Sequence, residues 1–431
     1  MTMPSRPIAS ALVAVALACG PLAAQNTQKL SLHDAEQIAI QNHPQIQAAV
    51  DIASAAKAQV TEQRSAYYPT AYGSLTAVDS ENNSRIAAGA LNNPIIYERY
   101  ANGLTITQLV TDFGRTHELV KSSNLHAQAE QESVVATRAD VLLGVDRAYF
   151  AVLKAQAVLK VAQETVKDRQ LVADQVTELE RNKIKSGLDV SFANVDLAQA
   201  QLLLVQAEND LDASNAQLSA ALGYGDQRSF QLVEEPLPSA PPAEFSDLLQ
   251  QALKNRPELI SLRLDADSAH SYATAERDLW FPTISAAGSA GLTPYGADQL
   301  APRYAAGGVN VNIPIFNGHL FGALRSEADS RARAKDQYLR DLQNHVVRDV
   351  RTAWLESNSA FQRLGLTDQL LKSATQAEDL AQSRYKLGLS SIIELSQAQL
   401  NMTQAELESA SARYDYEMQL SALSYQIGSL R

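Results

Sequence analysis

The chain has 431 residues, a net charge of −12, a pI near 5.1 and only 6% aromatic residues. Length alone indicates two or three domains, but a composition poor in aromatics, proline and glycine favours long helices packed by small residues. The acidic balance leaves no basic face for a phosphate backbone, so nucleic acid is not an expected partner.

The N-terminus has the pattern of a secretory signal peptide. Arg6 precedes an apolar run over residues 8–18, which is shorter than the roughly 20 residues that span a bilayer. Cleavage after Ala24 makes residues 1–24 the signal peptide and removes Cys19, the only cysteine. In a second interpretation, which stays open, Cys19 is the lipidated first residue of a lipoprotein, although Ala16 stands where leucine is usual. Both interpretations predict an exported chain without a disulfide bond.

The mature chain is expected to begin with a helix and continue as a β-hairpin. The helix is predicted over residues 31–66, with Ser31 as its N-cap, and runs past Asn42-His43-Pro44. Side-chain polarity then alternates with a period of two over residues 71–108. This alternation predicts two strands, with a Ser/Asn-rich loop over residues 79–84.

A very long helix is predicted over residues 116–180. This window lacks proline, and its apolar positions recur at spacings of three and four. At 1.5 Å per residue it would be on the order of 100 Å long, which exceeds a globular helix. A turn containing Lys183 and Gly187 ends it, and a helix over residues 189–223 returns. A Pro-rich linker over residues 233–245 follows.

The pattern then starts again, which predicts a tandem duplication. Asp189 and Glu394 each follow a turn and are 205 residues apart, whereas Pro44 and Pro257 are 213 residues apart. The change of offset falls in the hairpin, where one loop insertion accounts for it. The predicted first helix–hairpin–helix repeat spans residues 25–232 and the second spans 246–431.

Each hairpin contains a strand with one polar and one apolar face. The polar positions are Thr105, Thr107, Asn310 and Asn312, and the apolar ones are Leu104, Ile106, Val309, Val311 and Ile313. The second hairpin is expected over residues 283–292 and 304–315. Aromatic residues flank the strands: Tyr67, Tyr68, Tyr97, Tyr100, Trp280, Phe281, Tyr295 and Tyr304. On strand pattern alone, a half-buried soluble sheet and a membrane barrel with aromatic girdles fit equally well.

The number of strands decides between these two sheets. One chain offers four strands, and closed barrels begin at about eight, so several copies must share a barrel. A membrane tolerates only closed sheets. The predicted fold is therefore mainly α with a membrane β-barrel: a long antiparallel α-helical coiled-coil tunnel plus four β-strands per protomer.

Over residues 30–430 these features resemble the TolC family of outer-membrane efflux channels. The motifs that carry the resemblance are Asn-x-Pro at 42 and 255, Tyr68-Pro69 and Phe281-Pro282, Asp112-Phe113-Gly114-Arg115, Ile315-Phe316-Asn317-Gly318, and Arg384-Tyr385-Lys386-Leu387-Gly388. The resemblance implies a homotrimer with a shared twelve-stranded barrel in the outer-membrane lipid and a helical tunnel in the periplasm. It also implies docking onto a periplasmic adaptor protein and an inner-membrane pump or secretion transporter.

The resemblance also implies a periplasmic gate at the helical tips. In the family, acids just past the second-repeat turn line the tunnel's aperture. Glu394 stands at the first of these positions, while Gln397 occupies the second and departs from the pattern. Asp189 is the corresponding first-repeat acid, and Tyr385 matches a tyrosine that helps to latch the closed state. Ser390 stands where the family's best-known member has an arginine.

Electrostatics gives the same acids a role that does not depend on the family. Three copies of each around a narrow axis would repel, by about 4 kcal/mol per pair at roughly 4 Å and an effective dielectric near 20. A closed aperture would need compensating bonds or cations, which predicts a cation-selective gate. Alternatively, both acids only stabilise the helices that start there. Because Gly388 replaces Lys183 in the second turn, the two tips are expected to differ in shape.

The predicted function is a passive outer-membrane exit duct for an efflux or type I secretion system. The alternative is a periplasmic coiled-coil adaptor, which would have one helical hairpin and compact β domains. An enzyme is not expected, because thin rods enclose no pocket. The seven histidines form no close pair at metal-ligand spacing, so no metal or cofactor is expected. The basic residues Arg181, Lys183 and Lys185 are either an adaptor-docking surface or a solvated turn.

Overall fold

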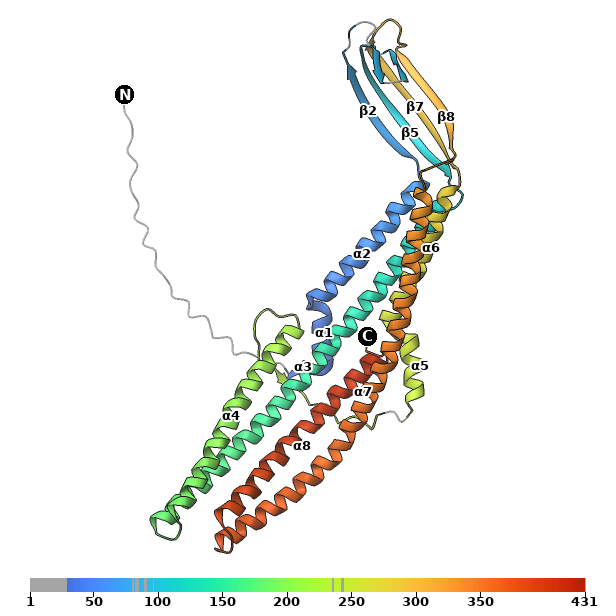
Figure 1. Ribbon diagram of the computed structural model, residues 1–431. Helices are drawn as coiled ribbons and strands as arrows, with labels where there is room; N and C mark the ends of the chain where they lie inside the picture. The colour runs from blue at the N-terminus through green and yellow to red at the C-terminus, as the bar shows by residue number, and fades with distance from the viewer. Residues whose placement is uncertain are drawn as a thin grey trace, which may run out of the picture.

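The computed structural model describes residues 29–79, 81, 85–88, 91–95, 97–234, 236–241 and 244–430. The predicted signal peptide and Cys19 lie outside the described residues. The described chain is elongated, with a β-sheet at one end and two long helical hairpins that end in tight turns at the other (Figure 1).

Helices make up most of the described chain. They are α1 (Leu32–Asn42), α2 (Pro44–Arg64), α3 (Arg115–Arg181), α4 (Gly187–Ala221), α5 (Phe245–Asn255), α6 (Pro257–Arg277), α7 (Leu320–Lys386) and α8 (Ile392–Gln426). Helices α3 and α7 have 67 residues each and are therefore about 100 Å long, as predicted for α3. In the described part of the chain, no helix combines the length and the apolar character needed to cross a membrane.

The helices of the two halves correspond one to one. Helices α3 and α7 begin 205 residues apart, at Arg115 and Leu320, and α4 and α8 have the same offset. Helices α1 and α5 have an offset of 213, as do α2 and α6. The longer connection between the strands of the first hairpin accounts for the difference. This correspondence of elements supports a tandem duplication.

The prediction of one helix over residues 31–66 is wrong, because the chain breaks at His43. Pro44 lacks an N–H and disfavours a helical residue before it. Accordingly, α1 ends at Asn42 and His43 is extended, with φ −73° and ψ 121°. Arg256, before Pro257, repeats this geometry in the second half. Ser31 caps α1 as predicted, and its side chain accepts a hydrogen bond from the Asp34 N–H.

Each half ends on a glycine that packs against this helix break. Gly223 and Gly428 have φ values of 82° and 72°, in the left-handed region. A Cβ on Gly223 would lie 2.9 Å from the Asn42 carbonyl oxygen, and one on Gly428 would lie 3.0 Å from the Asn255 carbonyl carbon. Glycine is therefore required at both positions for conformation and for space.

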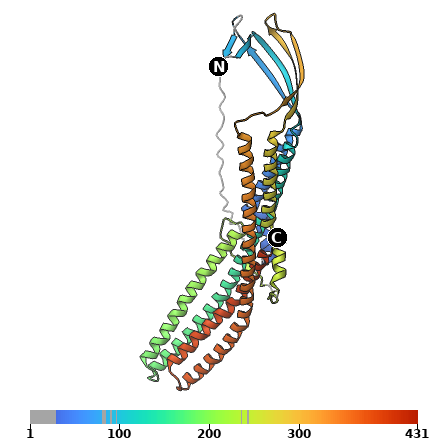
Figure 2. The same cartoon turned by 45° about the vertical axis from the view of Figure 1, so that its right-hand side comes forward.

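The strands are β1 (Lys29–Leu30), β2 (Thr70–Val78), β3 (Arg85–Ala88), β4 (Leu91–Ile95), β5 (Arg99–Thr111), β6 (Gln231–Leu232), β7 (Thr283–Gly296) and β8 (Arg303–Asn312). The main sheet is antiparallel in the order β2-β5-β7-β8 and is curved (Figure 2). Most of the predicted loop over residues 79–84 lies outside the described residues. Strands β3 and β4, which the alternation did not indicate, form a small additional antiparallel pair. Strand β8 ends at Asn312, before the predicted limit of residue 315.

A buried core joins the short helices to the long ones. Around Tyr149 of α3, which is fully buried, apolar residues of α1, α3 and α4 form one cluster. The Tyr149 hydroxyl donates to the Val233 carbonyl oxygen (2.6 Å) and also lies within 2.9 Å of the Leu30 carbonyl oxygen, which ties β1 and the chain after β6 to α3. An equivalent cluster of α5, α7 and α8 surrounds Val346 and Val350. These cores fix the long helices from which both tips project.

Candidate functional site

The turns at the two helical tips have the same backbone conformation. Lys183 (φ 61°) and Gly388 (φ 71°) are both left-handed. In each turn the next N–H closes the helix end: Ile184 N donates to the Leu179 oxygen (2.9 Å), and Leu389 N donates to the Arg384 oxygen (2.8 Å). The expectation of differently shaped tips is therefore wrong for the backbone. This helix ending requires a left-handed residue, and Lys183 adopts that conformation at a modest steric cost.

The two tip acids make different contacts, although both stand in the first turn of a helix. The Asp189 carboxylate accepts bonds from the Ser186 N–H (2.9 Å) and hydroxyl (2.8 Å), forming a reciprocal cap at the start of α4. The backbone N–H of Ser186 lowers the pKa of Asp189 because it stabilises the charged carboxylate. Ser391 caps α8 in the same way through the Glu394 N–H, but the Glu394 carboxylate lies 3.3 Å from Arg384 Nε. Asp189 is thus held by its own helix, whereas half-exposed Glu394 pairs with α7.

Tyr385 lies inside a small apolar cluster that joins the two hairpins near their tips. Its side chain is 6% exposed and belongs to a cluster with Val176 of α3 and Leu395 of α8. The Lys185 ammonium lies 3.8 Å from its ring centroid, a favourable cation–π distance. Within the described residues the Tyr385 hydroxyl has no hydrogen-bond partner. Burial is the main cause that raises the pKa of Tyr385, and the negative charge of Asp189 raises it further.

The remaining residues predicted at the tips do not join this cluster. Gln397 is exposed, and its amide donates to Asn401 one turn along the same helix (3.0 Å). Gly187 is the first residue of α4, and the space around it is open. It therefore starts a helix and takes no part in the left-handed turn.

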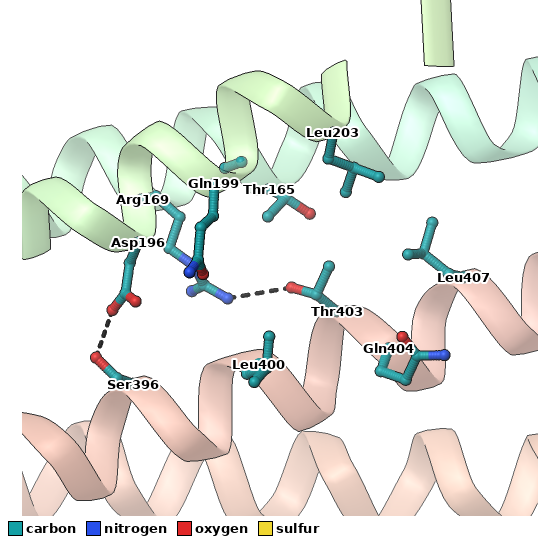
Figure 3. A pocket seen from close by; sticks show the side chains of 11 residues that line it. Thr165, Arg169, Asp196, Gln199, Leu203, Ser396, Leu400, Thr403, Gln404 and Leu407 are labelled. Carbon is teal, nitrogen blue, oxygen red and sulfur yellow. Dashed lines mark hydrogen bonds between the residues drawn. The ribbon is translucent and has the colours of Figure 1, made fainter. Parts of the chain in front are cut away.

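Arg169 of α3 forms a connection between the hairpins that the sequence analysis missed. Its side chain is 8% exposed. The guanidinium donates to the backbone oxygen of Gln399 in α8 (2.8 Å). It also donates to the hydroxyl of Thr403 in the same helix (3.1 Å; Figure 3). Burial lowers the pKa of Arg169, while the charges of Asp196 and Glu378 act against this shift. The arginine is held as a cation between two coiled coils.

A second polar contact lies beside Arg169. The Ser396 hydroxyl of α8 donates a short hydrogen bond to the Asp196 carboxylate of α4 (Figure 3). Both residues line a cavity of about 200 Å³ between the hairpins, together with Leu400 and Leu407. The hairpins are therefore joined here by polar bonds around an incompletely filled space. Such an interface separates more readily than a close-packed apolar core.

The pattern of α3 contains a signal that reveals Arg169. Its buried positions recur at three and four residues, and they are Ala162, Thr165, Arg169, Ala173 and Val176. An arginine in a stripe of small apolar residues must find partners on the facing helix, because an unpaired buried charge is costly. The stripe was visible in the sequence. The identity of the facing helix was not.

The four predicted lumen residues share one face of the main sheet. Thr107 pairs with Thr70 and Ala287, and Asn310 pairs with Ser285. The Thr70 and Thr107 hydroxyls are 2.6 Å apart. Thr105 and Asn312 lie two residues further along the same face, called here the polar face. The opposite face, called the apolar face, carries Leu75, Leu104, Ile106, Val309 and Val311, all largely exposed.

The predicted girdle residues lie where the helices meet the sheet. Tyr67, Tyr68, Trp280 and Phe281 directly precede β2 and β7, and all four are exposed. The structure adds Phe113, whose ring centroid is 6.2 Å from that of Phe281. Exposed aromatic rings beside an exposed apolar sheet are typical of a membrane interface.

Comparisons with known proteins place this architecture in a family. A family model described as "Outer membrane efflux protein" matches residues 36–224 and 248–429, so it covers both repeats. The chain is 24% identical to outer membrane protein TolC of Escherichia coli K12 over 405 residues, which are 90% of this chain and 80% of TolC. It is also 24% identical to alkaline protease secretion protein AprF of Pseudomonas aeruginosa over 418 residues, 93% of this chain and 85% of AprF.

Solved structures share the fold at low sequence identity. The Campylobacter jejuni CmeC outer membrane channel superposes with a TM-score of 0.79 at 16% identity, over 99% of this chain and 94% of CmeC. The Vibrio cholerae outer membrane protein VceC gives 0.78 at 18% identity, over 92% of this chain and 96% of VceC. The family match, which spans both repeats, shows that the chain belongs to the outer membrane efflux protein family.

Proposed function

We propose that the protein is a passive exit duct of the outer membrane, serving a tripartite efflux or type I secretion system. Three copies would close a twelve-stranded barrel in the membrane, and their long helices would form a tunnel in the periplasm. The protein has no catalytic role in this proposal, since a pump or transporter in the inner membrane supplies the energy through a periplasmic adaptor.

One observation carries the proposal: the main sheet is amphipathic and has two edge strands. In the described chain, β2 and β8 each pair on one side only, and the apolar face is exposed. Free sheet edges are not tolerated in lipid, so the sheet must close with other copies. The apolar face would then contact lipid, and the polar face with Thr105, Thr107, Asn310 and Asn312 would line the lumen.

The family match and the fold both oppose the alternative of a periplasmic adaptor. The part of the chain that the structure describes contains two long helical hairpins, α3–α4 and α7–α8. The adaptor alternative required a single hairpin with compact β domains.

The tips would form the periplasmic gate. In the closed gate the two hairpins would be held together by three contacts: the Arg169 bonds to α8, the Asp196–Ser396 hydrogen bond and the apolar cluster around Tyr385. Glu394 is the acid better placed to act on passing ions, because the Asp189 carboxylate is engaged in its cap. Opening would separate the hairpins along the cavity beside Arg169.

The cargo would be determined by the partner proteins. Similar proteins are named for different cargo. AprF is an alkaline protease secretion protein, TtgC of Pseudomonas putida is the outer membrane protein of a toluene efflux pump, and CzcC of Cupriavidus metallidurans is a cobalt-zinc-cadmium resistance protein. Because one fold serves such different cargo, we expect the tunnel wall to discriminate little between exported molecules.

Membrane fractionation tests the proposal. The protein should remain in the outer-membrane fraction after an alkaline carbonate wash, and detergent should extract a particle with the mass of three chains. Release by the carbonate wash, or a monomeric extract, would overturn the duct.

A further inference from the structure

The ring of Tyr304 on β8 lies across two glycines on the polar face of the sheet. Cross-strand pairing aligns Ser74, Gly103, Gly291 and Tyr304 in one row over all four strands. Because paired residues point to the same side, the Tyr304 ring is on the polar face. Its hydroxyl donates to the Asn102 carbonyl oxygen at 3.3 Å, so the ring reaches back from the edge strand over β7 to β5.

Both glycines are needed for this ring position. A Cβ on Gly103 would overlap the Tyr304 hydroxyl, and a Cβ on Gly291 would overlap the same hydroxyl and the Asn102 carbonyl oxygen. In contrast, a Cβ on Gly73 or Gly308 of the same sheet would meet nothing within 4 Å. The two glycines thus form a recess of the right depth under the one tyrosine that occupies it.

We propose that the recess of Gly103 and Gly291 holds Tyr304 flat against the lumen wall and thereby sets the bore of the duct at this level. The inference rests on the proposed function, because the polar face lines a lumen only when three sheets close. Three copies would carry three such rings at one height. A ring displaced from its recess would project into the lumen, and three displaced rings would narrow it from all sides.

A purely structural role for the pair would leave a different signature. An aromatic ring over cross-strand glycines also stabilises a sheet. In that case a substitution would change the thermal stability of the oligomer and leave the bore unchanged. The test must therefore measure which molecules pass the Tyr304 row.

A cysteine at Thr107 reports that passage. Thr107 lies on the polar face two rows nearer the helices than Tyr304, so a reagent from outside the cell passes the Tyr304 row first. Intact cells carrying Thr107→Cys are treated with maleimide-polyethylene glycols of graded size. The measured quantity is the largest reagent that labels the thiol, and the narrow periplasmic tips do not affect it.

Adding Gly103→Ala to the reporter chain should lower this size limit, because the new methyl group expels the ring. Tyr304→Ala in the same chain should restore the limit to that of the unmodified recess or above it. Gly73→Ala is the matched control, since it adds the same methyl group to open space on the apolar face, and it should change nothing. If Gly103→Ala prevents assembly, Tyr304→Trp decides, because a larger ring over intact glycines should also lower the limit.

The outcomes separate the two proposals. An unchanged limit in every assembled variant would overturn the recess and leave the duct intact. A lowered limit that Tyr304→Ala does not restore would also overturn the recess. Failure of the smallest reagent to label Thr107→Cys in the assembled protein would contradict a water-filled lumen, and the recess would fall with it.

Discussion

The guanidinium of Arg169 in α3 is bonded to the backbone oxygen of Gln399 in α8 at 2.8 Å. This bond joins the coiled coil of the first repeat to that of the second. It spans 230 residues of sequence and has no counterpart in the other repeat, since residue 374 is alanine. The duplication therefore supplies two equivalent hairpins, and an asymmetric polar contact holds them together.

Removal of this contact should loosen the part of α8 that lies nearer the tip. Arg169→Met keeps an unbranched apolar side chain in place of the arginine stem but loses the guanidinium and both hydrogen bonds to α8, for a cost of about 1–3 kcal/mol. Amide hydrogen exchange around Gln399 should be faster in the variant. Thr403→Val is the control, because it removes only the weaker acceptor, and it should have a smaller effect. Equal exchange in Arg169→Met and the wild type would refute the bond's role.

The acids at the tips should contribute unequally to ion selectivity. Glu394→Gln removes a charge that is half exposed beside Arg384, and it should weaken cation selectivity and block by divalent cations. Asp189→Asn should mainly weaken the α4 cap, at about 0.5–2 kcal/mol. Reversal potentials in a salt gradient measure the selectivity. Unchanged potentials in both variants would remove the acids from the gate and leave Asp189 as part of a helix cap and Glu394 as the ion-pair partner of Arg384.

The glycines that end each half should be sensitive to a single methyl group. Gly223→Ala and Gly428→Ala each place a Cβ about 3 Å from backbone atoms of the helix break and strain a left-handed residue. Each should lower stability by about 1–3 kcal/mol. Gly225→Ala is the matched control, because its Cβ would meet nothing within 4 Å. Thermal unfolding of the purified protein provides the measurement, and three equal midpoints would contradict the packing described here.

The buried carboxyl of Asp146 should make stability depend on pH. The Asp146 side chain is 2% exposed, and its burial and the nearby Glu36 raise the pKa of Asp146 to about 7. A hydrogen bond with Ser421 acts in the opposite direction and lowers this pKa. The unfolded chain releases this proton near pH 4. The folded state therefore binds more protons between about pH 4 and 7, and stability should fall as pH rises through this window.

Asp146→Asn tests this expectation, because the amide carries no charge at any pH in the window. The variant should flatten the slope and be more stable than the wild type at pH 8. Asp210→Asn, at an exposed position of α4, should keep the slope of the wild type. A wild type whose midpoint does not change between pH 5 and 8 would show that Asp146 is not the source of such a dependence.

Local sequence features were enough to predict most of the architecture. The length of α3, the two turns and the alternation of Thr105 and Thr107 follow from periodicity and from the positions of proline and glycine. The extended conformation of His43 was missed, because only this one residue separates the two helices. His43 leaves the helical conformation since Pro44 follows it, and the next helix starts directly at Pro44. The left-handed Lys183 was missed because the closing hydrogen bond of a helix end outweighs the preference for glycine.

Contacts between elements that are distant in the chain could not be predicted from the sequence patterns. Tyr304 was read as a flanking aromatic, but its ring lies on the polar face over Gly103 and Gly291. That position depends on strand register, which fixes the facing residues across strands. Arg169 needed the same kind of information, namely which helix faces its stripe.

Single-channel conductance tests most directly whether the protein is an outer-membrane duct closed at its helical tips. Wild-type oligomer and Arg169→Met, both extracted from outer membranes, would be inserted into planar lipid bilayers. We expect discrete pores of low conductance in the wild type and a clearly higher conductance in the variant, because its hairpins separate. No pores in either protein, or the same conductance in both, would contradict it.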